Sequence, residues 1–161
     1  MTWSKTFGPV GPDEAQRHAL LARDGCSLDV IIRADATSIA VAGAVTKTEH
    51  RTSALIDTGA SKVCIDYRIA QELDLRQIDQ TTLLVVGGKI EAPIYLGLLE
   101  IPGLEYREMI ELVAPKIGQL RCEVLLGRSL LSAFIMTFDG PGGQVHFSRR
   151  VPDYLQPYDY G

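Results

Sequence analysis

One stretch constrains this chain more than any other, because an acidic residue ends a hydrophobic strand and is followed at once by Thr-Gly. The sequence there reads Ala54-Leu55-Ile56-Asp57-Thr58-Gly59-Ala60-Ser61. A buried carboxylate without a partner is costly or takes up a proton, so we expect Asp57 to face a cleft. Gly59 removes the side chain where the backbone of a ligand would approach. The stretch predicts a carboxylate displayed on a tight turn, although the bare tripeptide is more often an ordinary Asx turn between two strands.

Two further motifs lie downstream. Two β-rich runs, residues 83–86 and 89–92, flank Gly87-Gly88, a pair that accepts the positive φ angles of a two-residue hairpin turn. Farther on, the chain reads Glu123-Val124-Leu125-Leu126-Gly127-Arg128-Ser129-Leu130-Leu131. Taken alone, this second motif is a core strand that ends at a glycine and opens a short helical run.

In this order and spacing, the three motifs resemble the single-domain retropepsin-like aspartic proteases, both retroviral and bacterial. The resemblance covers roughly residues 27–148. It implies an all-β fold, an acid-protease barrel with one short helix after the Leu-Leu-Gly motif. The domains are then predicted as an N-terminal extension at 1–26, the protease domain at 27–148 and a C-terminal tail at 149–161. Helix formers between Asp13 and Arg23, followed by Gly25, predict a short helix in the extension.

The resemblance also implies roles for individual residues. Asp57 would be the catalytic acid, in an active-site loop that continues through Thr58, Gly59, Ala60 and Ser61. In such a loop Thr58 would hold its counterpart across a twofold axis. The carbonyl of Gly59 would bind the substrate backbone, and Ala60 would leave room beside the scissile bond.

Two other groups of residues follow from the same resemblance. The flap that closes over an extended peptide would have its substrate-binding tip at Val86, Gly87, Gly88 and Lys89. Leu126 and Gly127 would pack beneath the Asp57 loop, and Arg128 resembles the arginine that braces the retroviral dimer.

The chain carries a single Asp-Thr-Gly, whereas aspartic proteolysis uses two carboxylates that share one proton. Asp66, Asp74, Asp79 and Asp139 stand in polar or turn contexts and are expected to be solvated cap or turn residues. The second carboxylate would therefore come from a second copy of the chain, which predicts a homodimer acting on a peptide or protein substrate.

Composition excludes several other classes. A net charge of −4 and a pI near 5.3 give no electrostatic footprint for nucleic acid or an anionic membrane. The cysteines, Cys26, Cys64 and Cys122, are widely spaced, and no histidine stands at metal-ligand spacing, so we expect reduced thiols, no metal and no cofactor. The N-terminal residues lack the apolar core of a secretory signal, which predicts a cytoplasmic protein.

The remaining chain is mostly predicted as strands. These are expected at residues 28–32, 38–45, 51–56, 96–101 and 109–113, with a hairpin around the turn at 139–143 and a short helix at 67–73. The flap hairpin is expected at 82–94, with Pro93 limiting how far its second strand can pair.

Three interpretations of function follow. The first is an active dimeric aspartic endopeptidase. The second is a retropepsin-like dimerisation or peptide-binding module with negligible turnover. The third is a structural β-barrel in which Asp57 merely closes a turn.

Overall fold

The computed structural model describes residues 3–35, 47–116 and 122–149. Contacts within the chain divide it into two compact units, residues 27–130 and residues 1–26 together with 131–161. Residues 131–148 thus group with the N-terminal residues, whereas the sequence analysis assigns them to the protease domain. The predicted domain limits stay a prediction, because compactness does not say which residues the activity needs. The strand predicted at 38–45 lies outside the described residues.

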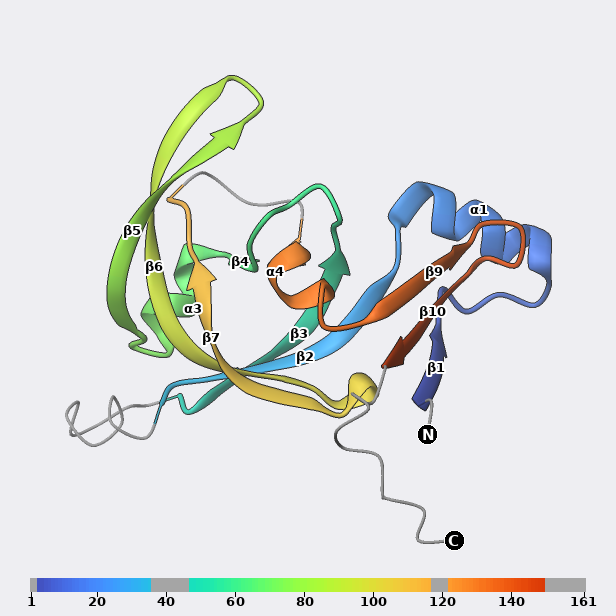
Figure 1. The fold of residues 1–161 in the computed structure, drawn as a ribbon, viewed down its shortest axis with the longest axis horizontal. Helices are drawn as coiled ribbons and strands as arrows, with labels where there is room; N and C mark the ends of the chain where they lie inside the picture. The colour runs from blue at the N-terminus through green and yellow to red at the C-terminus, as the bar shows by residue number, and fades with distance from the viewer. Residues whose placement is uncertain (1–2, 36–46, 117–121, 150–161) are drawn as a thin grey trace, which may run out of the picture. The chain divides into compact units, whose positions relative to one another are not determined.

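Six strands of the larger unit close into a barrel (Figure 1). They pair around the ring in the order β2, β3, β8, β4, β7, β6, and β6 pairs back onto β2. The seventh strand, β5, pairs with β6 outside this ring. The strands are β2 (Ser27–Arg33), β3 (Glu49–Ile56), β4 (Cys64–Ile65), β5 (Arg76–Val85), β6 (Gly88–Ile101), β7 (Tyr106–Val113) and β8 (Val124–Leu126).

The core of the barrel is aliphatic. Ile32 of β2, Leu99 of β6, Leu112 of β7 and Leu126 of β8 have no exposed surface. Burying a side chain of this size stabilises the fold by about 1.5–3 kcal/mol. Four different strands contribute these residues, so the barrel is held together mainly by apolar packing inside the ring.

The hairpin of β5 and β6 is longer than predicted, and its turn lies one residue earlier. Val85 pairs with Gly88, so the two loop residues are Val86 and Gly87, and Gly88 already belongs to β6. The limit expected at Pro93 is wrong. Pro93 lies inside β6, where it pairs with Gln80, and its carbonyl accepts a hydrogen bond from the Ala114 amide (3.0 Å).

Two short helical segments, α3 (Tyr67–Glu72) and η1 (Pro102–Leu104), lie in the larger unit, and a third, α4 (Arg128–Leu131), begins in it. Asp66 caps α3 by accepting a hydrogen bond from the Arg68 amide (2.9 Å). Its other oxygen binds the Arg68 guanidinium (2.7 Å). Asp66 is a cap, as predicted, but it is buried rather than solvated, with 8% of its surface exposed. The hydrogen bond from Arg68 lowers the pKa of this carboxyl group.

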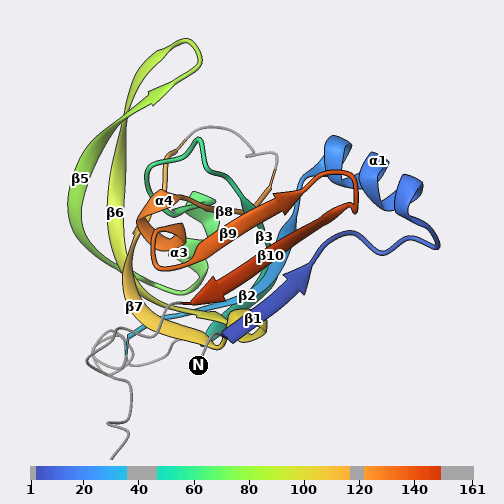
Figure 2. The ribbon, with the colours of Figure 1, turned by 45° about the vertical axis from the view of Figure 1, so that its right-hand side comes forward.

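The smaller unit is a three-stranded sheet with one helix. Strands β1 (Trp3–Phe7), β10 (Gln144–Arg149) and β9 (Ile135–Asp139) lie side by side in that order (Figure 2). The hairpin predicted around residues 139–143 is thereby confirmed, and β1 is a strand that the sequence analysis did not predict. The predicted N-terminal helix is also confirmed, as α1 (Glu14–Asp24).

Local sequence explains both the ends and the placement of α1. Its N-cap, Asp13, accepts a hydrogen bond from the Gln16 amide (2.8 Å), and Gly25 ends the helix at a φ of 74°. The turn between β9 and β10 approaches the helix closely at Gly143. A Cβ at Gly143 would lie 2.5 Å from the backbone carbon of Arg17, so only glycine fits there.

The predicted all-β fold class is confirmed by these two sheets. None of the helices in the described parts of the chain is both long and apolar enough to cross a membrane.

Candidate active site

Asp57 follows β3 directly, and β8 holds it in place from the neighbouring position in the sheet. The two strands run parallel, with Ala54 paired to Val124 and Ile56 to Leu126. The Asp57 amide continues this ladder by donating a hydrogen bond to the Leu126 carbonyl (3.1 Å). The backbone of Asp57 is therefore fixed by the sheet, while its side chain is half-buried.

The carboxylate of Asp57 organises the turn that follows it. Its Oδ1 atom accepts hydrogen bonds from the amides of Gly59 (2.8 Å) and Ala60 (3.2 Å). A Cβ at Gly59 would lie only 3.0 Å from the same oxygen. Within the described residues no donor reaches Oδ2, so that oxygen is available to a ligand or a second carboxylate. The Asx turn is common to a structural and a catalytic aspartate, and by itself it does not separate them.

The segment Leu126-Gly127-Arg128 packs against the Asp57 loop. The amides of Arg128 and Ser129 donate to the carbonyls of Ala60 (2.9 Å) and Ser61 (3.0 Å). At Gly127 the two backbones almost touch, because a Cβ built there would lie 2.1 Å from the Lys62 carbonyl oxygen. The structure thus brings together all eight predicted residues of the loop and its support, namely Asp57, Thr58, Gly59, Ala60, Ser61, Leu126, Gly127 and Arg128.

The Arg128 side chain contacts the same loop. Its Nη1 atom donates to the carbonyls of Thr58 (2.7 Å) and Gly59 (3.0 Å). One guanidinium therefore fixes both residues. Thr58 is the residue expected to contact a second chain, and Gly59 is the one expected to contact a substrate. The expected dimer-bracing role of Arg128 stays a prediction.

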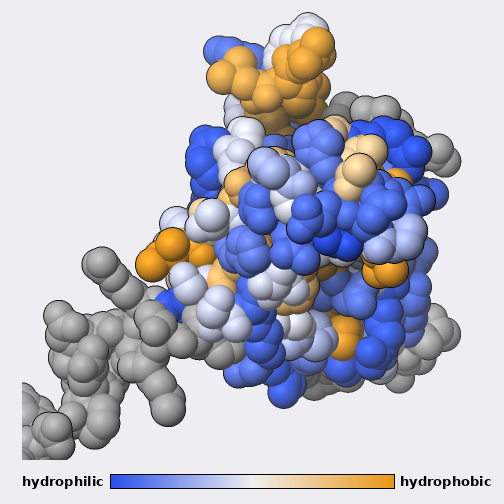
Figure 3. Space-filling model, turned by 90° about the vertical axis from the view of Figure 1, so that its right-hand side faces the viewer, coloured by the Kyte–Doolittle hydropathy of each residue, from blue (hydrophilic) through white to orange (hydrophobic). Residues whose placement is uncertain are grey.

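The flap residues stand apart from the loop. Val86 is fully exposed and Leu84 is 82% exposed, which gives the hairpin a hydrophobic tip (Figure 3). No hydrogen bond or ion pair in the described parts of the chain joins Val86, Gly87, Gly88 or Lys89 to the Asp57 loop. Instead the connection runs through Leu83 of β5, two residues before the closing pair of the hairpin, and Leu125 of β8. Both pack against one cluster of buried residues, Cys64, Ala92, Ile94 and Val113.

The turn of the flap offers a direct test of whether this hairpin is the lid. Gly87 has a φ of 104°, and a Cβ there would meet no atom within 4 Å, so a side chain is opposed by backbone strain alone. We expect Gly87→Val to cost about 1–3 kcal/mol locally and to lower kcat/KM roughly tenfold. Tm should change little, because the exposed tip can open locally and release the strain without unfolding the barrel. Gly87→Asn is the matched control, since asparagine tolerates positive φ. Equal kcat/KM in the valine variant and wild type would show that this hairpin is not the lid.

Two thiols lie close enough to Asp57 to respond to its charge. Burial raises the pKa of Cys64 to about 11, with a further contribution from the negative charge of Asp57. The same two causes raise the pKa of Cys122. Both thiols are therefore protonated at neutral pH. Because the thiolate is the nucleophilic form of cysteine, neither thiol is suited to nucleophilic catalysis. The cysteines are free, and the described residues contain no cluster of metal-ligating side chains.

Sequence reasoning missed a polar cluster on the barrel that includes His50, Thr52 and Glu123. The Nε2 atom of His50 lies 3.2 Å from Glu123, and the Thr52 hydroxyl donates to the same carboxylate (2.6 Å). Two features of the sequence could have indicated this cluster. His50 and Thr52 are polar residues two positions apart on the strand that delivers Asp57, and Glu123 directly precedes the Leu-Leu-Gly strand.

The larger unit is thus a closed β-barrel in which a Leu-Leu-Gly strand supports one Asp-Thr-Gly turn, the arrangement expected of an acid protease. A family model described as aspartyl protease matches residues 39–130. This match spans more than half of the chain, so the chain belongs to the aspartyl protease family, and the resemblance stated from the sequence is confirmed. No curated protein matched the chain.

Several solved structures are similar to this chain. The solution structure of the simian foamy virus (mac) protease has 18% identity and a TM-score of 0.43, and the match covers 66% of this chain and 91% of that one. The EIAV protease, complexed with the inhibitor HBY-793, has 21% identity and a TM-score of 0.43, with 51% and 75% covered. A Legionella pneumophila protein of unknown function has 16% identity and a TM-score of 0.35, with 51% and 74% covered.

Proposed function

We propose that the chain is an aspartic endopeptidase that acts as a homodimer. The observation that carries the proposal is the Asp57 turn, whose Oδ1 is held by two amides while Oδ2 is left without a donor among the described residues. In a dimer around a twofold axis, Oδ2 of each chain can turn toward its counterpart. One group of the pair is ionised and accepts a proton from a water molecule as that water attacks the peptide carbonyl. The other group is protonated and donates its proton to the carbonyl oxygen.

The substrate in this proposal is an extended peptide with apolar side chains around the scissile bond. The aliphatic character of Val85, Val86, Ile90 and Leu125 supports that preference. The flap would cover the peptide and exclude water, with backbone hydrogen bonds to the peptide. Binding of this kind selects for shape and hydrophobicity rather than for one sequence.

Mixing chains of two kinds tests the proposal. At a concentration well above the dimer dissociation constant, excess Asp57→Asn chains would draw wild-type chains into inactive heterodimers. With random pairing, a ninefold excess would reduce the activity per wild-type chain to about one tenth. The measurement is the cleavage rate of a labelled peptide at constant wild-type concentration, with an inert protein at matched concentration as control.

Two outcomes would contradict the proposal. The first is an unchanged rate in the presence of the variant chains, which would show that one chain suffices for catalysis. The second is a dimer that binds peptides from a mixed library without cleaving any of them. That result would favour a peptide-binding module.

A further inference from the structure

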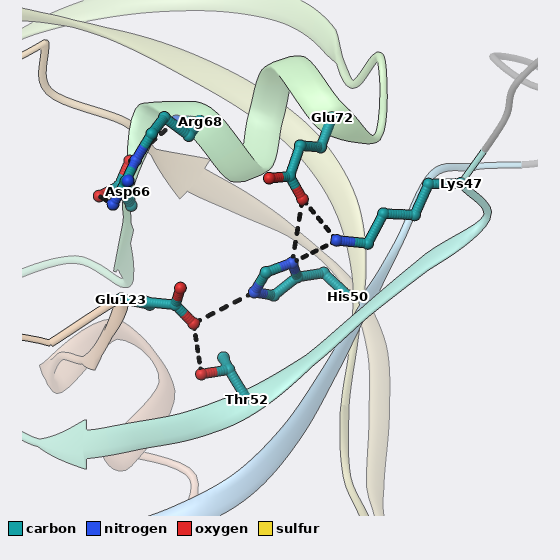
Figure 4. Close-up of polar contacts among 7 residues, drawn as sticks. All are labelled: Lys47, His50, Thr52, Asp66, Arg68, Glu72 and Glu123. Atoms are coloured by element: carbon teal, nitrogen blue, oxygen red, sulfur yellow. Dashed lines mark hydrogen bonds and ion pairs between the residues drawn. The ribbon is translucent and has the colours of Figure 1, made fainter.

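A charged cluster of Lys47, His50, Thr52, Glu72 and Glu123 lies along β3, the strand that delivers Asp57, and the proposed catalysis does not use it (Figure 4). His50 of β3 is at its centre, with 12% of its side chain exposed. Its Nε2 atom lies 3.2 Å from Oε2 of Glu123, and its Nδ1 atom lies 3.3 Å from Oε2 of Glu72 and 3.0 Å from the Lys47 ammonium. The imidazole therefore bridges helix α3 and the residue that precedes β8.

Glu123 connects this cluster to the active site. Its carboxylate accepts hydrogen bonds on the β3 side, and its backbone carbonyl accepts one from the Asp66 amide (2.8 Å). The next three residues are β8, and the carbonyl of the last one, Leu126, holds the Asp57 amide. So short a strand has few backbone hydrogen bonds of its own. The side-chain contacts of Glu123 at its start therefore help set its register against β3.

We propose that His50 is a positioning residue for Asp57. His50 holds Glu123 and the start of β8 against β3, and the strength of this hold depends on whether His50 is protonated. The inference rests on the proposed function, because the carboxylate it positions is the proposed catalytic one. His50 touches neither Asp57 nor its loop. Its effect is transmitted through the three paired residues of β8.

The hydrogen-bonding rules of the groups around His50 make the cluster sensitive to a proton. An ammonium only donates and a carboxylate only accepts, whereas a neutral imidazole does one of each. Neutral His50 can donate from Nε2 to Glu123 and accept at Nδ1 from Lys47. Protonated His50 donates from both nitrogens, so Glu72 replaces Lys47 as the partner of Nδ1, and the bond to Glu123 then joins two opposite charges.

The other charges facing the cluster keep its carboxylates ionised. The Thr52 hydroxyl, followed by His50, lowers the pKa of Glu123, with Arg68 adding to the effect. Lys47 is the main cause of the lowered pKa of Glu72. Asp66, on which the charge of His50 also acts, has a lowered pKa, chiefly through Arg68. The pKa values of these three carboxyl groups are lower in the folded than in the unfolded chain. Their contribution to the free energy of unfolding is therefore present above the unfolded pKa values and is lost as the pH falls through the folded pKa values.

Steady-state kinetics of His50→Gln test the proposal. Glutamine can still donate to Glu123 but cannot gain a proton. We expect kcat per dimer to fall about fivefold in acid with KM within about twofold, and one step of the wild-type pH profile to disappear. Thr52→Val removes only the hydroxyl bound to Glu123 and should also lower kcat. This variant replaces His50→Gln in the test if His50→Gln does not fold. The matched control is Glu49→Gln, a change on the same strand where the carboxylate pairs with Arg33 and Arg51, and it should leave kcat within about twofold.

A second measurement does not depend on hydrolysis. In Asp57→Asn protein, NMR would follow the backbone amide of residue 57 and the His50 ring protons against pH. We expect the chemical shift of the residue 57 amide to change with pH at the same midpoint as the chemical shifts of the His50 ring protons. This change should be absent in protein that also carries His50→Gln. An amide that stays constant while the ring titrates would overturn the inference even if the enzyme is active. If wild type cleaves no peptide, the proposed function fails, and the NMR result alone decides whether His50 positions residue 57.

Discussion

If the chain is the proposed endopeptidase, Asp57→Asn protein should lose nearly all peptide hydrolysis, while its barrel remains folded. The amide oxygen of asparagine can still accept the hydrogen bonds that the Gly59 and Ala60 amides donate to Oδ1. What the variant loses is the ability to take up and release a proton, so we expect the cleavage rate to fall by a factor on the order of 10³ or more. The measurement is the cleavage of a labelled peptide mixture, with circular dichroism and Tm as checks on folding.

Asp139→Asn is the matched control for this change. Asp139 also holds a turn, since its Oδ1 atom accepts a hydrogen bond from the Gly142 amide (2.9 Å), but it belongs to the smaller unit. The control should cleave peptides at close to the wild-type rate. Substantial cleavage by the Asp57 variant would refute the aspartic mechanism, and an equal loss in both variants would point to a general effect of losing an Asx turn.

Gly127→Ala is expected to damage both stability and activity. The new methyl group would lie 2.1 Å from the carbonyl oxygen and 2.6 Å from the carbonyl carbon of Lys62, and backbone atoms cannot turn away as a side chain can. The Asp57 loop and β8 would have to separate, at a cost of about 1–3 kcal/mol, which for a chain of this length corresponds to a Tm lower by roughly 2–12 °C. Because the same shift moves the Asp57 carboxylate, kcat should fall roughly a hundredfold.

Gly140→Ala serves as the control, because the nearest atom to its Cβ lies at 3.5 Å on the Phe138 side chain. Thermal unfolding and peptide cleavage would be measured for both variants. Wild-type activity in Gly127→Ala would mean that the close approach between β8 and the loop does not position Asp57.

The parts predicted correctly from the sequence are those that local chemistry determines. The Asp57 turn follows from a carboxylate and a glycine two residues apart, and α1 has both of its capping residues within the chain segment that forms it. The hairpin turn was misplaced by one residue because Gly87 and Gly88 both accept positive φ. Cross-strand pairs such as Leu83 with Ile90 decide between the two registers, and the turn sequence does not contain that information.

The parts that were missed depend on residues far apart in the sequence. Strand β1 has no pattern long enough to identify it, and it forms because Trp3–Phe7 pairs with β10 at the opposite end of the described chain. Pro93 is accommodated in β6 because the contact it makes there uses its carbonyl, which proline retains. The contacts of His50 with Glu72 and Glu123 join three separate segments, and no local spacing reveals them.

The parallel pairing of β3 with β8 also determines when the Asp57 turn can form as the chain is made. Ala54 and Val124 are 70 positions apart, so the amide of Asp57 has no strand to bind until nearly the whole barrel sequence has left the ribosome. Pairings of such high contact order form slowly, because the entropy of closing the intervening loop is lost before the contacts compensate for it. A nascent chain that already includes the flap thus carries the Asp57 carboxylate without the β8 contact that fixes its backbone.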